Sequence, residues 1–327
     1  MTTQAIGTHP GRRDKRFAAE IYGFVREFQN IEIRVTPENV EECVYAFVHP
    51  PYMLQSVSMI EDDEKFKQLK ERHRARLQRV KEARETTGKD IRCFLDRQFY
   101  EGDGREKHIA DGRAELADIR KLLREAVDQE LVSISRGKKY PDGYDLRRWL
   151  KKYGVGIDCS SFVQQVLRCL IDMSRAEVGK VTDNELELDK GLLRCGWVYR
   201  NITEGARYGE PAFVEVTSPI KARPGDVVVS RSHIRIVANV EVVEGEGIVF
   251  ELAESTSARD MPMGQMCEEI DIGPRIIQVK YPKPDQPIVK QTPLKKRLID
   301  DTFKEDKAER SYIIGRYQAF EQFWGSV

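Results

Sequence analysis

The feature that most constrains this chain is the stretch Gly156–Val163 and the apolar pattern that follows it. Apolar residues then recur at intervals of three and four, which predicts one buried face of a helix; they are Phe162, Val163, Val166, Leu167, Leu170 and Met173. Cys159 therefore stands where a helix begins. The N–H groups and the positive dipole end of a helix N-terminus favour a thiolate, so Cys159 is a candidate nucleophile. The alternative is a half-buried structural cysteine, the usual role of a free Cys.

Length and charge bound the remaining possibilities. A chain of 327 residues suffices for one large domain or two modest ones. Its 54 Lys and Arg residues balance 54 Asp and Glu residues, so the net charge is zero. No global field attracts nucleic acid or an anionic membrane, and we predict neither as a partner. No oligomeric state is predicted.

The N-terminal stretch and the cysteines indicate the compartment. Residues Met1–Arg26 lack a continuous apolar segment of signal-peptide length, and no apolar run is long enough to span a bilayer. We expect a cytoplasmic protein, with signal-independent export as the alternative. The six cysteines form no CxxC pair and resemble neither a disulfide framework nor a zinc site, so no metal or cofactor is expected; they are Cys43, Cys93, Cys159, Cys169, Cys195 and Cys267.

The pattern of apolar residues, glycines and prolines divides the chain into three regions. Residues 1–113 form a mainly helical N-terminal region without recognisable chemistry. Residues 114–281 form the candidate catalytic domain, with a polar, glycine-containing insertion of loops at 174–220. Residues 282–327 consist of a proline-rich linker and a tail that we expect to be helical.

The second half of the catalytic region is rich in strand signals. Alternating or β-branched runs predict strands at 227–229, 232–240, 248–255 and 276–281. The turn Glu244–Gly247 predicts that the second and third of these form an antiparallel hairpin. With the Cys159 helix, these strands predict the α+β class.

A thiol nucleophile needs a base, and His233 is the candidate. It alone of the five histidines follows Cys159 in the chain. A third polar group should orient its imidazole. The strand after Gly247 offers Glu251 and Glu254, which are three positions apart and therefore point to opposite faces. We favour Glu254, with Glu251 as the alternative.

These residues resemble a known family. The sequence Asp158-Cys159-Ser160-Ser161-Phe162-Val163 resembles the Asp-Cys-Ser-Gly-Phe-Val nucleophile motif of the NlpC/P60 cysteine peptidases. The stretches Pro224–Val228 and Ser232–Val237 resemble that family's Pro-Gly-Asp-Leu-Val and His-Val-Gly-Ile-Tyr strands, with Arg235 in place of the glycine. Gly137–Tyr140 is similar to the family segment whose tyrosine lines the active site. The resemblance covers roughly residues 115–281.

The resemblance implies a papain-like core, in which a cysteine-bearing helix packs on an antiparallel sheet. To this core the chain adds the helical N-terminal region that its own pattern predicts. It implies a thiol hydrolase that cleaves amide bonds in peptidoglycan stem peptides or related cell-wall fragments. By this analogy Cys159 attacks the carbonyl carbon, His233 acts as base and then acid, and Glu254 orients His233. Tyr140, Asp158 and Ser160 would contact the substrate or the oxyanion.

Two other functions fit the same residues. The family's third residue is commonly histidine, and a glutamate there is more like the related CHAP amidases, so an N-acetylmuramoyl-L-alanine amidase is one alternative. The other is a binding protein that keeps the fold without turnover.

Overall fold

The computed structural model describes most of the chain, namely residues 11–36, 40–53, 67–100, 112, 114–178, 193–205, 212–231, 233–243, 247–256, 273–281, 287–288, 295–298 and 312–320. The chain divides into two compact units, each built from several stretches of sequence. The sheet unit comprises Met1–Phe24, Val163–Glu254 and Ile276–Val327. The helical unit comprises Val25–Phe162 and Ser255–Arg275. The two units do not follow the predicted boundaries at 113 and 281. The N-terminal region contributes to both units, and residue 281 lies within the stretch Ile276–Val327 of the sheet unit.

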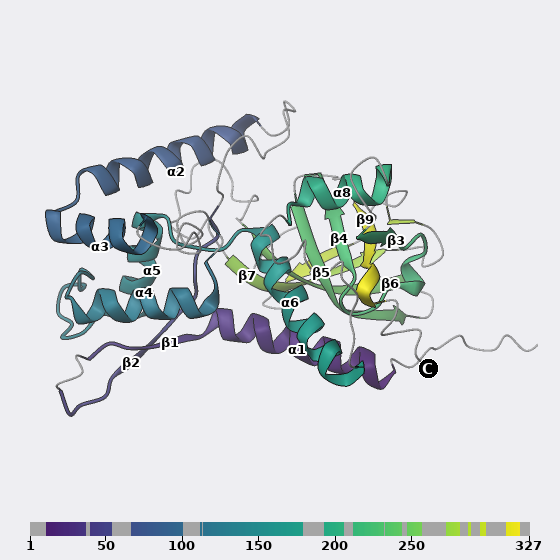
Figure 1. Ribbon diagram of the computed structural model, residues 1–327, viewed down its shortest axis with the longest axis horizontal. Helices are drawn as coiled ribbons and strands as arrows, with labels where there is room; N and C mark the ends of the chain where they lie inside the picture. Colours follow the sequence, from purple (N-terminus) through teal and green to yellow (C-terminus); the bar gives the residue numbers. More distant parts are fainter. Residues whose placement is uncertain are drawn as a thin grey trace, which may run out of the picture. The chain divides into compact units, whose positions relative to one another are not determined.

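The helical unit contains four complete helices and a two-stranded sheet within its described residues (Figure 1). Its elements are β1 (Ile31–Arg34), β2 (Tyr45–Val48), α2 (Lys67–Glu85), α3 (Lys89–Tyr100), α4 (Leu116–Asp128) and α5 (Gly143–Tyr153). Strands β1 and β2 pair antiparallel. Helix α1 (Arg12–Gln29) begins in the sheet unit and ends in this one.

Helix α5, which precedes the Cys159 segment, is fixed at both ends. The Asp142 side chain accepts a hydrogen bond from the backbone N–H of Asp145, as an N-cap does. Gly154 ends the helix in the left-handed conformation at φ 71°, which glycine adopts without strain. Between these caps, Trp149 and Tyr153 are buried against each other, with ring centroids 5.0 Å apart. The chain therefore enters the Cys159 segment from a well-anchored helix.

The sheet unit is organised around a seven-stranded sheet with the order β3-β9-β4-β5-β6-β7-β8 (Figure 1). The strands are β3 (Phe213–Glu215), β4 (Val227–Ser230), β5 (His233–Val243), β6 (Gly247–Thr256), β7 (Gly273–Tyr281), β8 (Lys295–Leu298) and β9 (Ile313–Tyr317). The pairs β3–β9, β9–β4, β4–β5, β5–β6 and β7–β8 are antiparallel. A short 3-10 helix, Pro219–Lys221, precedes β4, and α8 (Cys195–Glu204) contacts β3, β4 and β5. The α+β class with antiparallel sheets is confirmed.

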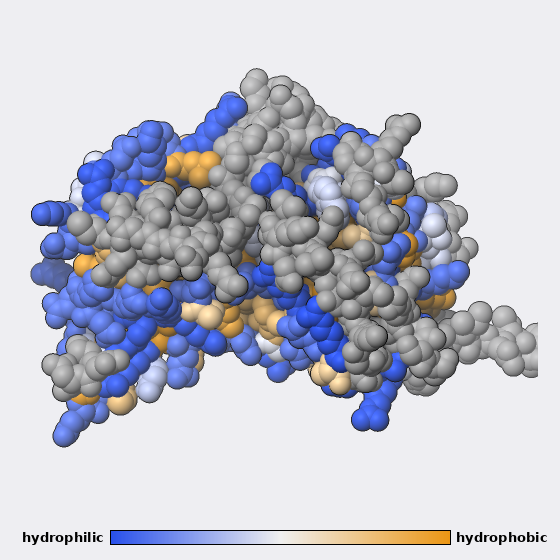
Figure 2. All heavy atoms as spheres, in the orientation of Figure 1, coloured by the Kyte–Doolittle hydropathy of each residue, from blue (hydrophilic) through white to orange (hydrophobic). Residues whose placement is uncertain are grey.

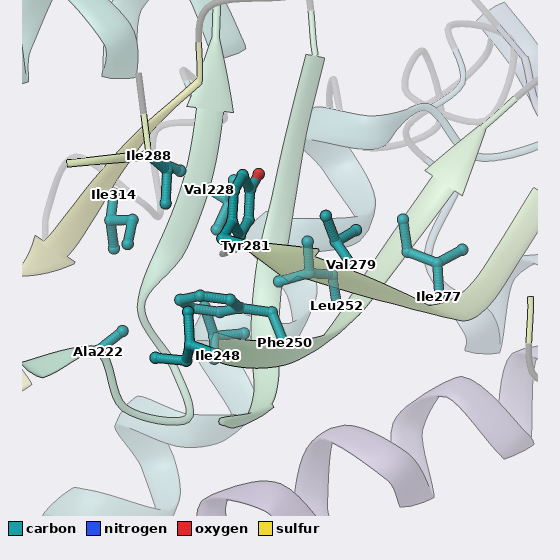
Figure 3. Packing of buried hydrophobic residues seen from close by; sticks show 11 residues of the cluster. Ala222, Val228, Ile248, Phe250, Leu252, Ile277, Val279, Tyr281, Ile288 and Ile314 are labelled. Carbon is teal, nitrogen blue, oxygen red and sulfur yellow. The ribbon is translucent and has the colours of Figure 1, made fainter. Parts of the chain in front are cut away.

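Alternating residues of these strands form the core of the sheet unit (Figure 3). The cluster consists of Ala222, Val228, Val237, Ile248, Phe250, Leu252, Ile277, Val279, Tyr281, Ile288 and Ile314. The rings of Phe250 and Tyr281 meet edge to face, with centroids 5.8 Å apart. Because Val237 and Leu252 belong to this cluster, Arg235 and Glu254, each two positions away on the side without the register shift at Val237/Asn239, point toward the same face.

Two sequence-based expectations about elements are corrected by the structure. Within its described residues, the tail that we expected to be helical contributes β8 and β9, and a helical turn at 318–320. Strand β9 lies between β3 and β4, and a Cβ at Gly315 would come within 2.3 Å of the Ile202 side chain, so this close approach suits glycine. The segment 174–220 is not only loops, since it contains the end of α6 (Cys159–Val178), α8 and β3.

In the view of Figure 2, hydrophilic side chains cover most of the described surface and hydrophobic ones reach it in small areas. Among the described residues, no helix has the length and apolar character needed to cross a membrane.

Candidate active site

The candidate site residues fall in both units. Cys159, Asp158 and Ser160 belong to the helical unit, and His233 and Glu254 belong to the sheet unit. Helix α6 itself starts in the helical unit with Cys159 and continues in the sheet unit from Val163.

Cys159 is the first residue of α6, as the sequence predicts. Asp158 precedes it, and its Oδ1 accepts a hydrogen bond of 2.6 Å from the backbone N–H of Ser161. The carbonyl of Asp158 accepts the first helical hydrogen bond, from Phe162 N at 3.0 Å, so Asp158 is the N-cap. The Cys159 Sγ lies 4.0 Å from the Oγ of Ser160, and both residues are buried. Asp158 thus fixes the point at which the helix starts, and with it the place of the thiol.

The backbone just before Cys159 is held by segments far away in the sequence. Ile157 forms a parallel bridge with Tyr52, through Ile157 N to Pro51 O at 3.1 Å and Met53 N to Ile157 O at 3.4 Å. Asp158 N donates to the carbonyl of Gly112 at 2.8 Å. These partners come from the N-terminal region, for which the sequence suggested no role. The region supplies backbone that positions the candidate nucleophile.

Gly156 allows that bridge to form. A Cβ at this position would lie 2.3 Å from the carbonyl oxygen of Pro51 and 3.0 Å from the Cβ of Met53. The first of these atoms belongs to the backbone, so a larger residue requires the bridged segment to move. The hydroxyl of Ser255, in the same unit, donates to the Ile157 carbonyl at 2.8 Å.

In the sheet unit, the register of β5 and β6 brings His233 to Glu254. The register pairs Ile236 with Ala253, so the next residues outward, Arg235 and Glu254, are cross-strand neighbours. His233 lies two positions from Arg235 and shares its face of the strand. The His233 Nε2 is 2.9 Å from the Glu254 Oε2, with side-chain exposures of 8% and 1%. The carboxylate can therefore hold one ring nitrogen, which leaves Nδ1 as the nitrogen that can take up or give a proton.

Arg235 is the residue that sequence reasoning undervalued. Its Nε donates to the same Oε2 of Glu254 at 2.6 Å, and its guanidinium lies over the Tyr312 ring at 4.7 Å from the centroid. Burial alone would lower the pKa of Arg235, but Coulombic interactions with Tyr312 and Glu254 outweigh burial and raise it. Tyr281 faces the same cation, and burial raises the pKa of Tyr281 to about 12. The only sequence signal was an arginine where the similar family has glycine.

The two remaining site candidates have other partners. Glu251, the alternative third residue, accepts a hydrogen bond from the Tyr22 hydroxyl, and its Oε1 accepts one from Gln278 Nε2 at 2.9 Å. The Tyr140 hydroxyl donates to Glu42 at 3.3 Å, and Lys139 binds the same carboxylate at 3.1 Å. Lys139, with Tyr140, holds the pKa of Glu42 below its usual value. A role for Tyr140 at an oxyanion stays a prediction.

No group of His, Cys, Asp and Glu among the described residues is suited to hold a metal ion.

Comparisons with family models, with curated proteins and with solved structures return no match to this chain.

Proposed function

We propose that this protein is a cysteine-dependent hydrolase that cleaves an amide or peptide bond, with Cys159 as nucleophile and His233 as base. The observation that carries the proposal is the buried 2.9 Å contact between the His233 Nε2 and the Glu254 Oε2. A carboxylate on one ring nitrogen stabilises the imidazolium that forms when the other nitrogen takes a thiol proton. The start of a capped helix at Cys159 supports the same role, since an anion is favoured there.

The reaction proceeds in two steps. In the first, the Cys159 sulfur forms a bond to the carbonyl carbon, the C–N bond breaks, and His233 gives the thiol proton to the departing amine. In the second, water attacks the acyl thioester with His233 as base, which releases the acid and returns the proton to the sulfur. The backbone N–H at the helix start is suited to stabilise the oxyanion of both steps.

The substrate class rests on the sequence resemblance to the NlpC/P60 family. By that analogy the scissile bond lies in the stem peptides of peptidoglycan or in related cell-wall fragments. A second candidate, the CHAP-like amidase, is favoured by one observation, namely that a glutamate and not a histidine contacts His233.

A muropeptide mixture tests both candidates. The wild-type protein, Cys159→Ala and Cys169→Ala are each incubated with the mixture, and the products are weighed by mass spectrometry. Cys169 lies in the same helix ten positions beyond its start, so its variant is the matched control for loss of a thiol. We expect turnover by the wild type and by Cys169→Ala, and none by Cys159→Ala.

The masses separate the candidates. Products shortened within the stem indicate an endopeptidase, and release of the whole stem peptide indicates the amidase. A wild-type protein that leaves every muropeptide intact contradicts the proposed substrate class. A Cys159→Ala variant that still cleaves contradicts the proposed nucleophile.

A further inference from the structure

Arg235 is a cation in a place where an apolar residue would be easier to bury. Only 7% of its surface is exposed, and it lies on the face of the sheet that carries the apolar core. Removing a guanidinium from water is costly, and a buried ion pair is often no more stabilising than apolar residues of the same size. The stability of the sheet is therefore a weak reason for an arginine at this position.

The contacts of Arg235 converge on the candidate catalytic pair. Its Nε and the His233 Nε2 approach the same oxygen, Oε2 of Glu254, at 2.6 and 2.9 Å. Glu254 is fully buried. A buried carboxyl without a cation favours its neutral form, in which it no longer supports an imidazolium. The ring of Tyr312, under the guanidinium, fixes the direction from which the cation approaches.

We infer that Arg235 is a positioning residue for the proposed hydrolase: it keeps Glu254 ionised and aims its Oε2 at His233. Arg235 acts through Glu254 and makes no bond to the reacting atoms. The inference rests on the proposed function, because it assigns Arg235 a part in the reactivity of Cys159.

The strands of the sheet determine which charged and titratable groups surround the Arg235 guanidinium. His233 lies on its own strand, Glu254 lies on β6, Tyr281 ends β7, and Tyr312 immediately precedes β9. Burial raises the pKa of Tyr281 to about 12, so this phenol is neutral near pH 7. Within this group, Glu254 is the carboxylate that pairs with Arg235.

The test measures the rate at which iodoacetamide alkylates Cys159 at neutral pH, read at that residue by peptide mass. Four variants are compared with the wild type: Arg235→Met, Arg235→Lys, Glu254→Gln and the double variant Arg235→Met/Glu254→Gln. Each single change to Met or Gln is expected to slow alkylation by about tenfold, which is the effect of one pKa unit. The double variant is expected to be no slower than Glu254→Gln, because both changes remove the same ionised pair.

The lysine variant provides the graded comparison. A lysine keeps the charge but presents a single ammonium in place of the planar guanidinium, so we expect a rate between those of the wild type and Glu254→Gln. Thermal unfolding of each variant confirms that the rates are measured on folded protein. If Arg235→Met does not fold, Arg235→Gln takes its place as the variant without the charge, and a rate equal to that of the wild type in that variant overturns the inference.

The outcomes separate this inference from the proposed function. If the wild-type Cys159 reacts no faster than Cys169, the proposed function fails. If Cys159 reacts fast and needs His233, but Arg235→Met reacts like the wild type, only the inference fails. Losses that multiply in the double variant, to about a hundredfold, also overturn it, since Arg235 would then act independently of Glu254.

Discussion

Replacing Glu254 with glutamine tests the buried pair most sharply. The side chain keeps its size and one acceptor oxygen, but it loses the charge that balances Arg235. Glu254 is fully buried and Arg235 is 7% exposed, so water compensates the remaining cation poorly. Breaking a buried ion pair by removing one partner typically destabilises a protein by about 3 to 5 kcal/mol. Because glutamine can still accept a hydrogen bond, we expect the lower end, about 3 kcal/mol.

Glu251→Gln is the matched comparison. It makes the same chemical change at a position three residues from Glu254, in the same strand β6. Glu251 is only partly buried and its partners, Tyr22 and Gln278, are neutral. We expect a loss of about 1 kcal/mol or less, because the change leaves no buried cation without its partner and glutamine keeps one oxygen that accepts a hydrogen bond.

Urea unfolding, followed by the fluorescence of the native tryptophans, measures both variants against the wild type. A difference of about 2 kcal/mol between them corresponds to a separation of the two midpoints by up to about 1 M urea. Alkylation of Cys159 is measured on the same samples and is expected to slow only in Glu254→Gln. If the two variants have the same stability within about 0.5 kcal/mol, the account of the buried pair is refuted.

Three further predictions concern other parts of the structure. Gly156→Ala places a Cβ 2.3 Å from a backbone carbonyl oxygen, so we expect the free energy of unfolding, measured in urea, to fall by about 1 to 3 kcal/mol. Gly23→Ala is the control, because its Cβ would enter open space and should not destabilise the protein. Asp226→Asn leaves Arg316 without the carboxylate that it binds through two 2.8 Å contacts, and a urea midpoint should reveal a loss of about 3 kcal/mol. Burial, helped by a nearby arginine, lowers the pKa of the folded-state His49 from 6.5 to about 4. Between these pH values only the unfolded chain binds a proton at His49, so the free energy of unfolding should fall by at most about 3 kcal/mol as the pH decreases from 6.5 to 4. Urea unfolding at both pH values measures this fall, which should be smaller in His49→Gln.

Local patterns were enough to predict the elements that carry the candidate residues. The three- and four-residue spacing after Cys159 predicted α6, and alternation predicted strands close to the bounds of β4, β5 and β6. The parity of Glu251 and Glu254 limited the choice to one of them, and the structure pairs His233 with Glu254. These successes share a cause, since helix and strand periods and hairpin turns are local properties of the sequence.

The remaining features depend on pairings between distant residues. Strand β9 carries Ile313 and Tyr317, whose spacing of four residues also fits a helix. Its place between β3 and β4 depends on pairing with strands that are distant in the sequence, and the ion pair of Arg316 with Asp226 stabilises that pairing. The bridge from Tyr52 to Ile157 runs through backbone atoms and therefore has no side-chain signature. The sequence showed Arg235 only as a departure from a family pattern. Its role was not visible there, because its counter-ion Glu254 lies on another strand.

The central claim is that Cys159 and His233 act together, and cross-linking them tests it most directly. Dibromoacetone first alkylates a reactive thiol and then a nucleophile beside it, so one molecule can join a thiol to an imidazole. The account predicts that peptide mapping of the treated wild-type protein finds Cys159 linked to His233, and that the link is absent in His233→Ala. A Cys159 that stays unmodified, or that is modified while His233 remains unlinked, would contradict it.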